Sequence, residues 1–207
     1  MGEAKLEEAL LASIAGKARA AREANERFFA AEAPRLVEAA SAIAQAYRNG
    51  GRLLTMGNGR SSCGAAHVAV EFVHPIAGGR PPLAAVNLVA DVAALSGFGD
   101  DLGFEHVFVR QLAAHGRCGD VLIGLSASGR SPNLIAAFAK ARQLGITTIA
   151  LTGYDRGALA ELVDHCLSVP TTVAHRVQEC HVVASHILWE LVHTLLAGER
   201  GAAGGAR

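Results

Sequence analysis

Residues 53–62 read LLTMGNGRSS, a short apolar run followed directly by a turn rich in glycine and serine. Residues 120–131, DVLIGLSASGRS, repeat the same order. In both stretches the apolar residues are consecutive, which is typical of strands that are buried on both faces of a parallel sheet. The residues after each turn, 65–73 and 133–144, have helical character. The two stretches therefore predict two strand–loop–helix units of an α/β fold.

The chain around these units continues the alternation of strands and helices. Further strands are expected at residues 83–89, 146–151 and 166–169, and a long apolar helix at residues 177–196. A helical or loop segment spans residues 91–114, and a short helix is expected at residues 159–162. The pattern predicts a sheet of five parallel strands with helices on both faces.

The first fifty residues are expected to form a helical arm. Apolar residues recur at helical spacing from Leu6 onward, and Pro34 predicts a break, so that about two helices share residues 6–48. Their apolar face needs a partner, either the rest of the chain or another subunit. We place the arm at residues 1–50, the main domain at 51–197 and a disordered, Gly/Ala-rich tail at 198–207.

The composition narrows the class of protein. The chain has 207 residues, of which 51% are apolar and 18% charged, so it can bury a sizeable core. Nineteen basic residues balance nineteen acidic ones, which argues against non-specific nucleic-acid binding. We expect no membrane-spanning helix and no signal peptide, and hence a cytoplasmic protein. The four widely spaced cysteines predict neither a zinc knuckle nor a disulfide framework.

Both Gly/Ser turns have the features of a phosphate site. Glycines let a ligand approach the backbone, serine hydroxyls donate hydrogen bonds, and the start of the following helix favours an anion. The alternative is an ordinary tight turn with a capping serine, but two such turns at equivalent junctions favour binding. Neither turn matches the GxxxxGK[ST] or GxGxxG patterns of nucleotide-binding loops.

Two pairs of polar residues on helices suggest a metal site. His67 and Glu71 are four residues apart and therefore share a helix face, as do Gln178 and His186 on the closing helix. Each pair taken singly is more often a surface pair or a core histidine than a ligand pair. Convergence of the two pairs would suit zinc or another divalent metal of borderline softness.

Taken together, the motifs resemble the phosphoheptose isomerase family of sugar isomerase (SIS) domains. The resemblance extends over residues 6–196 and is carried by residues 57–61, His67 with Glu71, 99–105, 119–122, 126–133, 151–153, 176–181 and His186. It implies a flavodoxin-like, three-layer αβα sandwich with a central five-stranded parallel sheet, assembled as a homotetramer with the N-terminal helices in the interface. It also implies interconversion of sedoheptulose 7-phosphate and D-glycero-D-manno-heptose 7-phosphate.

The same resemblance implies roles for individual residues. Zinc would be held by His67, Glu71, Gln178 and His186, and Glu71 and His186 would form the acid–base pair. Phosphate would be bound by serines, and Asp101 would lie near the sugar. The full set of candidate substrate-binding residues is Asn58, Gly59, Arg60, Ser61, Asp100, Asp101, Ser126, Ser128, Arg130, Ser131 and Gln178.

Several positions depart from the family pattern. The family usually has glycine at Arg60, threonine at Ala127 and asparagine at Arg130, and it commonly differs at Gly64 and Asp100 as well. The two arginines could bind phosphate or point to solvent, and they leave open a different phosphosugar or a second anionic group on the substrate.

Two other functions remain as alternatives within this fold. One is a non-catalytic regulator that binds a replication initiator protein, and the other is a phosphosugar sensor. The regulator subgroup lacks the glutamate and the closing-helix histidine, whereas Glu71 and His186 are both present here, which favours the enzyme.

Overall fold

The centre of the molecule is a five-stranded sheet with every strand parallel to its neighbours, in the order β2-β1-β3-β4-β5. This computed structural model describes residues 2–76 and 78–204. The prediction of five parallel strands is confirmed, and the strand order is that of flavodoxin-like folds. The strands are β1 (Leu53–Gly57), β2 (Ala85–Asn87), β3 (Val121–Ser126), β4 (Thr147–Gly153) and β5 (His165–Val169).

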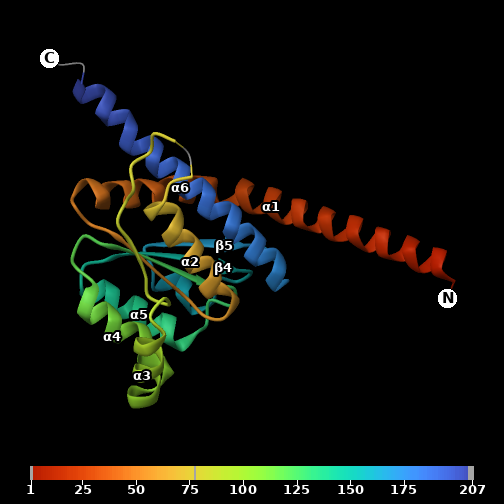
Figure 1. Ribbon diagram of the computed structural model, residues 1–207, viewed down its shortest axis with the longest axis horizontal. Coiled ribbons are helices and arrows are strands. Elements are labelled where there is room, and N and C mark those ends of the chain that lie inside the picture. The colour runs from red at the N-terminus through yellow and green to blue at the C-terminus, as the bar shows by residue number, and fades with distance from the viewer. Residues whose placement is uncertain (1, 77, 205–207) are drawn as a thin grey trace.

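Helices cover both faces of the sheet, so the molecule is a three-layer αβα sandwich (Figure 1). One face packs against α1, α2 and α6, and the other against α4 and α5, with α3 beside α4. The helices are α1 (Glu3–Arg48), α2 (Arg60–Val73), α3 (Val92–Leu102), α4 (Val107–His115), α5 (Pro132–Gln143) and α6 (Ala174–Gly204), with the 3₁₀ turns η1 (Phe104–His106) and η2 (Gly157–Glu161).

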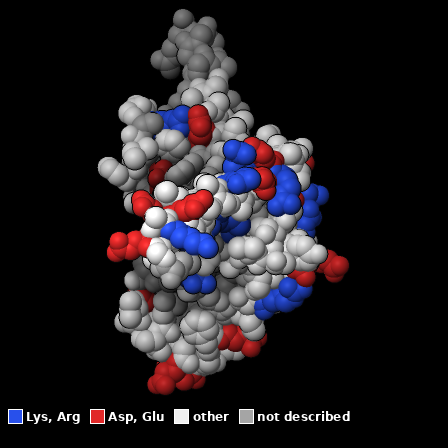
Figure 2. All heavy atoms as spheres, turned by 90° about the vertical axis from the view of Figure 1, so that its right-hand side faces the viewer, with Lys and Arg blue, Asp and Glu red and all other residues white. Residues whose placement is uncertain are grey.

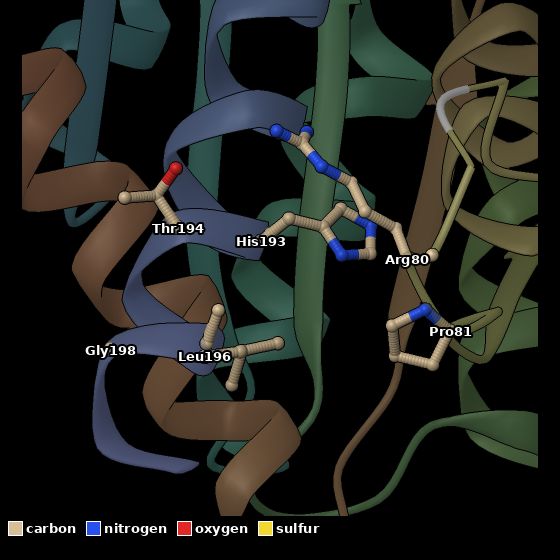
Figure 3. A pocket seen from close by; sticks show the side chains of 8 residues that line it. Arg80, Pro81, His193, Thr194, Leu196 and Gly198 are labelled. Atoms are coloured by element: carbon tan, nitrogen blue, oxygen red, sulfur yellow. The ribbon is translucent and has the colours of Figure 1, made fainter. Parts of the chain in front are cut away.

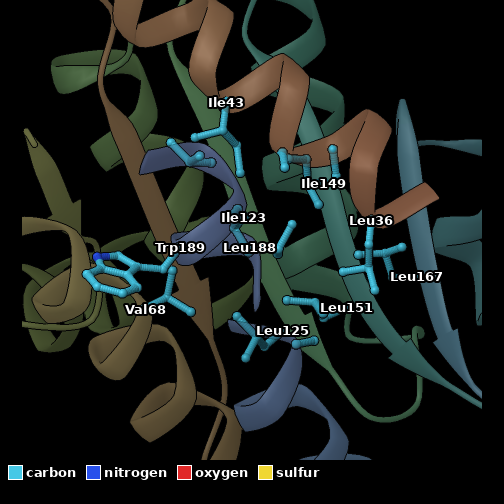
Figure 4. Packing of buried hydrophobic residues seen from close by; sticks show 14 of the residues in the cluster. Leu36, Ile43, Val68, Ile123, Leu125, Ile149, Leu151, Leu167, Leu188 and Trp189 are labelled. Carbon is cyan, nitrogen blue, oxygen red and sulfur yellow. The ribbon is translucent and has the colours of Figure 1, made fainter. Parts of the chain in front are cut away.

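Successive residues of the strands alternate between the two cores, as the geometry of a strand requires. Val121, Ile123 and Leu125 of β3 join the core under α1, α2 and α6, whereas Leu122 joins the core under α4 and α5. Figure 4 shows the first of these cores, with Leu36 of α1 packed over the strands. The consecutive apolar residues of the sequence are therefore explained by burial on both sides.

The prediction of two N-terminal helices is wrong, because α1 is one helix from Glu3 to Arg48 with Pro34 inside it. A proline removes one backbone hydrogen bond and crowds the preceding turn. Here buried residues lie on both sides of Pro34, among them Phe28, Leu36 and Ile43. Packing against α6 and β5 holds the helix together across the proline.

The N-terminal half of α1 extends beyond the sheet and contacts little of the chain (Figure 1). Four large apolar side chains are exposed there, with exposed fractions between 45% and 65%: Leu6, Leu10, Leu11 and Ile14. An exposed apolar surface of this kind on one helix is a candidate interaction surface.

Helix α6 differs from the sequence prediction in two respects. It continues to Gly204, so residues 198–204 are helical instead of disordered, while residues 205–207 lie outside the described part. Over Ala174–Gly198 it is also long and apolar enough to cross a membrane, which the sequence was not expected to contain. Val177, Leu188 and Val192 of this helix are buried in the core, which accounts for its apolar character.

One ionisable side chain joins α6 to the sheet. His181 is 3% exposed, and its Nε2–H donates a hydrogen bond to the backbone oxygen of Thr152 in β4 at 3.0 Å. Burial lowers the pKa of His181 from 6.5 to about 4, although the hydrogen bond to Thr152 acts in the opposite direction. The folded protein therefore holds this ring neutral.

This buried ring predicts a pH-dependent stability. Between pH 6.5 and about 4 the unfolded chain binds a proton at His181 and the folded chain does not, so stability falls as the pH falls through this window. We expect this one group to lower the free energy of unfolding by about 2 kcal/mol between pH 7 and pH 5. Urea unfolding of the wild type and of His181→Gln at both pH values measures it. An equal loss of stability in the two proteins would contradict the prediction.

Candidate functional site

The two Gly/Ser loops lie side by side at the carboxyl ends of β1 and β3, which are neighbours in the sheet. In flavodoxin-like sheets the ligand binds at this switch point of the strand order. A cavity of about 470 Å³ opens between the loops and the start of α6. Its lining is Asn58, Gly59, Arg60, Ser61, Leu125, Ser126, Ala127, Ser128, Ser131, Ala174 and Gln178.

A pair of amides connects the two loops. Asn58 Nδ2 donates to Asn133 Oδ1 at 2.8 Å, and Asn133 Nδ2 donates to Asn58 Oδ1 at 2.9 Å. Asn133 is 2% exposed, so a partner for its amide is needed. The side-chain oxygen of Asn133, Oδ1, also accepts a hydrogen bond from the backbone N–H of Leu134. The amide pair therefore fixes the spacing of the loops at the base of the cavity.

Each loop has a glycine in the left-handed region, where a side chain would be strained. Gly59 has φ +52° at the start of α2, and Gly129 has φ +62° in the second loop. Ser126 Oγ accepts the backbone N–H of Gly129 at 3.1 Å and lies 3.4 Å from Ser131 Oγ. The start of α2 also falls at Arg60, five residues before the predicted start, so the first two residues of this helix, Arg60 and Ser61, line the cavity.

Beside this cavity, α2 and α6 bring together the predicted ligand residues. The Nε2 atoms of His67 and His186 are 2.8 Å apart, and His67 Nε2 is 3.8 Å from Glu71 Oε1. One ligand atom from each of the three residues lies within 4.8 Å of the others. Gln178 borders the smaller cavity of about 180 Å³ that His67 also lines, together with Arg60 and Ser61.

This donor set fits a zinc ion. Two imidazole nitrogens and a carboxylate oxygen are ligands that zinc takes, and a tetrahedral site would hold them about 3.3 Å apart. His186 is exposed and His67 and Glu71 are partly exposed, so an ion and a substrate can reach the cluster. Without an ion, one imidazole must donate its N–H to the bare nitrogen of the other ring.

Three of the predicted substrate-binding residues do not line the cavity of about 470 Å³ between the loops, which we call the serine-lined cavity. Arg130 lines a neighbouring cavity of about 290 Å³, where its guanidinium pairs with Asp155. Asp100 and Asp101 are exposed near the end of α3 and border neither cavity. The other eight lie together around one cavity: Asn58, Gly59, Arg60, Ser61, Ser126, Ser128, Ser131 and Gln178.

Three residues that shape the site have no predicted role. Asn133 pairs with Asn58, Asp155 pairs with Arg130, and His181 lines the smaller cavity next to His67. Asn133 follows Pro132 as the second residue of its helix, the place that Ser61 has in the helix after the first loop, which is a usable signal. Asp155 lies 25 residues from Arg130, and nothing in the sequence connects the two.

A separate cavity of about 480 Å³ lies near the end of α6 and contains none of these residues. Figure 3 shows Arg80 and Pro81 on one side of it and His193, Thr194 and Leu196 of α6 on the other. The Arg80 guanidinium stacks over the ring of Trp189 at 4.4 Å, which gives this arginine a structural role.

The surface carries charges of both signs. On the face in Figure 2, lysines and arginines lie among aspartates and glutamates. A basic stripe of the kind that tracks a nucleic-acid backbone is not seen on that face.

Comparison with known proteins agrees with this geometry. The model of the SIS domain family matches residues 18–153. The phosphoheptose isomerase of Rhodospirillum rubrum is 40% identical over 164 residues, which cover 79% of this chain and 87% of that protein. The phosphoheptose isomerase of Chlorobaculum parvum is 44% identical over 160 residues, covering 76% of this chain and 77% of that protein.

Two solved structures share the whole fold. A phosphoheptose isomerase from Francisella tularensis superposes with a TM-score of 0.85 at 33% identity, covering 89% of this chain and 98% of that one. The phosphoheptose isomerase from Neisseria gonorrhoeae has a TM-score of 0.80 at 38% identity, covering 91% and 99%. The family match includes both loops of the switch-point cavity, and the chain belongs to the SIS domain family.

Proposed function

We propose that this chain is a phosphoheptose isomerase that interconverts sedoheptulose 7-phosphate and D-glycero-D-manno-heptose 7-phosphate. The observation that carries the proposal is the cluster of His67, Glu71 and His186 beside a cavity lined by serines. An aldose–ketose isomerase needs an acid–base pair at one end of its substrate and an anion site at the other. Relatives with this name are 40% to 44% identical to the chain.

The phosphate end of the substrate is assigned to the two loops. Ser61, Ser126, Ser128 and Ser131 border the cavity and offer hydroxyl groups, and the N-terminal end of α2, whose first residues Arg60 and Ser61 line the cavity, favours an anion there. Arg60 lines both the serine-lined cavity and the smaller one, so its guanidinium can neutralise part of the phosphate charge. Binding at this end positions the flexible sugar for the reaction.

The proton transfers are assigned to Glu71 and His186. The reaction moves one proton between C1 and C2 through an enediol and also shifts a proton between the two oxygens. The Glu71 carboxylate can take the proton from one carbon and return it to the other. The His186 imidazole can exchange a proton with the oxygens, and the neighbouring His67 ring at 2.8 Å limits its orientation.

The zinc ligands are proposed to be His67, Glu71, Gln178 and His186. A bound zinc ion would stabilise the negative charge that develops on the enediol oxygens. Three of these residues offer ligand atoms within 4.8 Å of one another, and Gln178 borders the same small cavity as His67.

We also propose that the protein is a cytoplasmic homotetramer that uses the N-terminal half of α1 as an interface. The exposed apolar residues of this helix support the proposal, since one face must find a partner. The initiator-binding regulator is not favoured, because the acid–base residues that it lacks are both present and adjacent here. A sensor role is disfavoured for the same reason.

Removal of either acid–base group should abolish turnover. We expect Glu71→Gln and His186→Ala to lower kcat with sedoheptulose 7-phosphate by about 10²- to 10⁴-fold. The matched control is Glu190→Gln, because Glu190 is exposed on α6 one turn beyond His186. Full activity in either site variant would contradict the assignment. Absence of turnover in the wild type, with binding to an initiator protein, would favour the regulator.

Zinc binding can be measured separately from turnover. We expect the chelated protein to take up about one zinc ion per chain in a titration, and His67→Ala to weaken this binding at least about tenfold, because it removes one nitrogen ligand. His74→Ala, on the residue after α2, is the control and should bind zinc as the wild type does. Equal zinc affinity in the wild type and in His67→Ala would exclude this metal site.

The proposed assembly depends on the apolar face of α1. We expect Leu10→Asp to reduce the mass of the assembly in light scattering, because it places a charge in the interface. Glu8→Lys is the control, since Glu8 points to the opposite side of the helix from Leu6 and Leu10. A tetramer that survives Leu10→Asp unchanged would argue against this interface.

A further inference from the structure

We propose that Arg130 is a positioning residue, which holds the loop of residues 126–131 in its anion-binding form by pairing with Asp155. The inference rests on the proposed function of this loop as a phosphate site. It assigns to Arg130 a role different from the direct phosphate contact that its place in the loop predicts.

The guanidinium of Arg130 contacts both the Asp155 carboxylate and the backbone of its own loop. Its Nη1 donates to Asp155 Oδ1 at 3.1 Å, and Nη2 also pairs with the other carboxylate oxygen, so the fork is bidentate. Nη1 additionally donates to the backbone oxygen of Ser128 at 3.3 Å. The backbone N–H of Arg130 donates to Ser128 Oγ at 3.3 Å. One side chain thus connects the carboxylate with the serine that borders the phosphate cavity.

The segment that carries Asp155 is well anchored. Asp155 Oδ1 accepts the backbone N–H of Gly157 at 3.2 Å. Arg156, next to it, donates to Glu32 of α1 at 3.1 Å, and that carboxylate is 3% exposed. Tyr154 and Arg156 have φ values of 22° and 65°, which non-glycine residues rarely adopt and which such contacts must hold in place.

The two backbones also approach each other very closely. The N–H of Leu159 donates to the oxygen of Gly129 at 3.3 Å. A Cβ at Gly129 would lie 2.1 Å from the oxygen of Arg156, and one at Gly157 would lie 2.4 Å from the oxygen of Gly129. The segment of residues 153–157 therefore provides a fixed support against which the loop is held.

The placement of the guanidinium distinguishes positioning from direct binding. Ser128 borders both the serine-lined cavity and the neighbouring cavity, whereas Arg130 and Asp155 border only the neighbouring one. The Arg130 fork is occupied by the carboxylate and by the loop backbone, and it holds the pKa of the Asp155 carboxyl below its usual range. Both side chains are exposed, Arg130 at 59% and Asp155 at 44%, so the pair acts through its geometry and not through burial.

The variant that decides the question is Asp155→Asn, since the two accounts predict changes of opposite sign. If Arg130 served the anion by charge alone, loss of a nearby negative charge would tighten phosphate binding. If the pair positions the loop, Asp155→Asn weakens phosphate binding, although removal of a negative charge favours an anion. Arg130→Lys tests the same point, because it keeps the charge and removes the bidentate fork.

The experiment measures the affinity for inorganic phosphate by calorimetry and the kinetics with sedoheptulose 7-phosphate. We expect Asp155→Asn and Arg130→Lys each to raise the Kd for phosphate and the KM by about fivefold, with kcat and the melting temperature little changed. The control is Glu161→Gln, which removes an exposed carboxylate from the nearby turn η2 and should leave both constants as in the wild type.

Unchanged or tighter phosphate binding by Asp155→Asn would overturn the inference while leaving the isomerase function intact. A fall in kcat together with a fall in the melting temperature would also overturn it, because a general structural role would then explain the weaker phosphate binding. If the wild type binds phosphate but does not convert the sugar, the proposed isomerase activity is refuted, and the phosphate affinities of the variants still test the role of Arg130. A wild type that neither binds phosphate nor turns over the sugar would refute both.

Discussion

The rest of the molecule depends on the parallel pairing of β1 with β3. This pairing joins residues that are 68 positions apart in the chain, such as Leu53 and Val121, and puts the carboxyl ends of the two strands at one edge of the sheet. Each end leads into a Gly/Ser loop and then into a helix, so both loops and the start of α2 line a common cavity. The double amide hydrogen bond between Asn58 and Asn133 holds the two loops at a fixed spacing.

Helix α6 adds the second half of the site because its packing leaves one face free. Val177, Leu188 and Val192 anchor it in the core, and His181 is bonded to β4. On the adjoining side of the same helix, Gln178 and His186 face the cavity region and α2. A rigid helix that is buried along one side can hold chemical groups accurately on the other.

Local patterns were sufficient to predict the sheet and most of the residues that the fold brings together in the candidate site. Runs of consecutive apolar residues indicated buried strands, and the pairs His67–Glu71 and Gln178–His186 followed from the periodicity of a helix. The length of α1 could not be predicted in this way, because packing on both sides of Pro34 overrides the local effect of the proline. The partner of Arg130 could not be predicted either, since its pairing with Asp155 depends on tertiary contact between two loops. The roles of Asp100 and Asp101 stay predictions, because α3 holds them away from the cavity of this chain.

The close backbone contact between Gly129 and residues 156–157 has a consequence for how this family member can change in evolution. A side chain added at Gly129 would collide with the Arg156 carbonyl, and an insertion in either loop would separate the two backbones. A substitution at the contact in one loop therefore requires a compensating substitution in the other loop if the contact is to be kept. New substrate preferences are thus expected to arise through paired substitutions in the two loops, or at Arg60, which is exposed and lines the cavity without such a backbone contact.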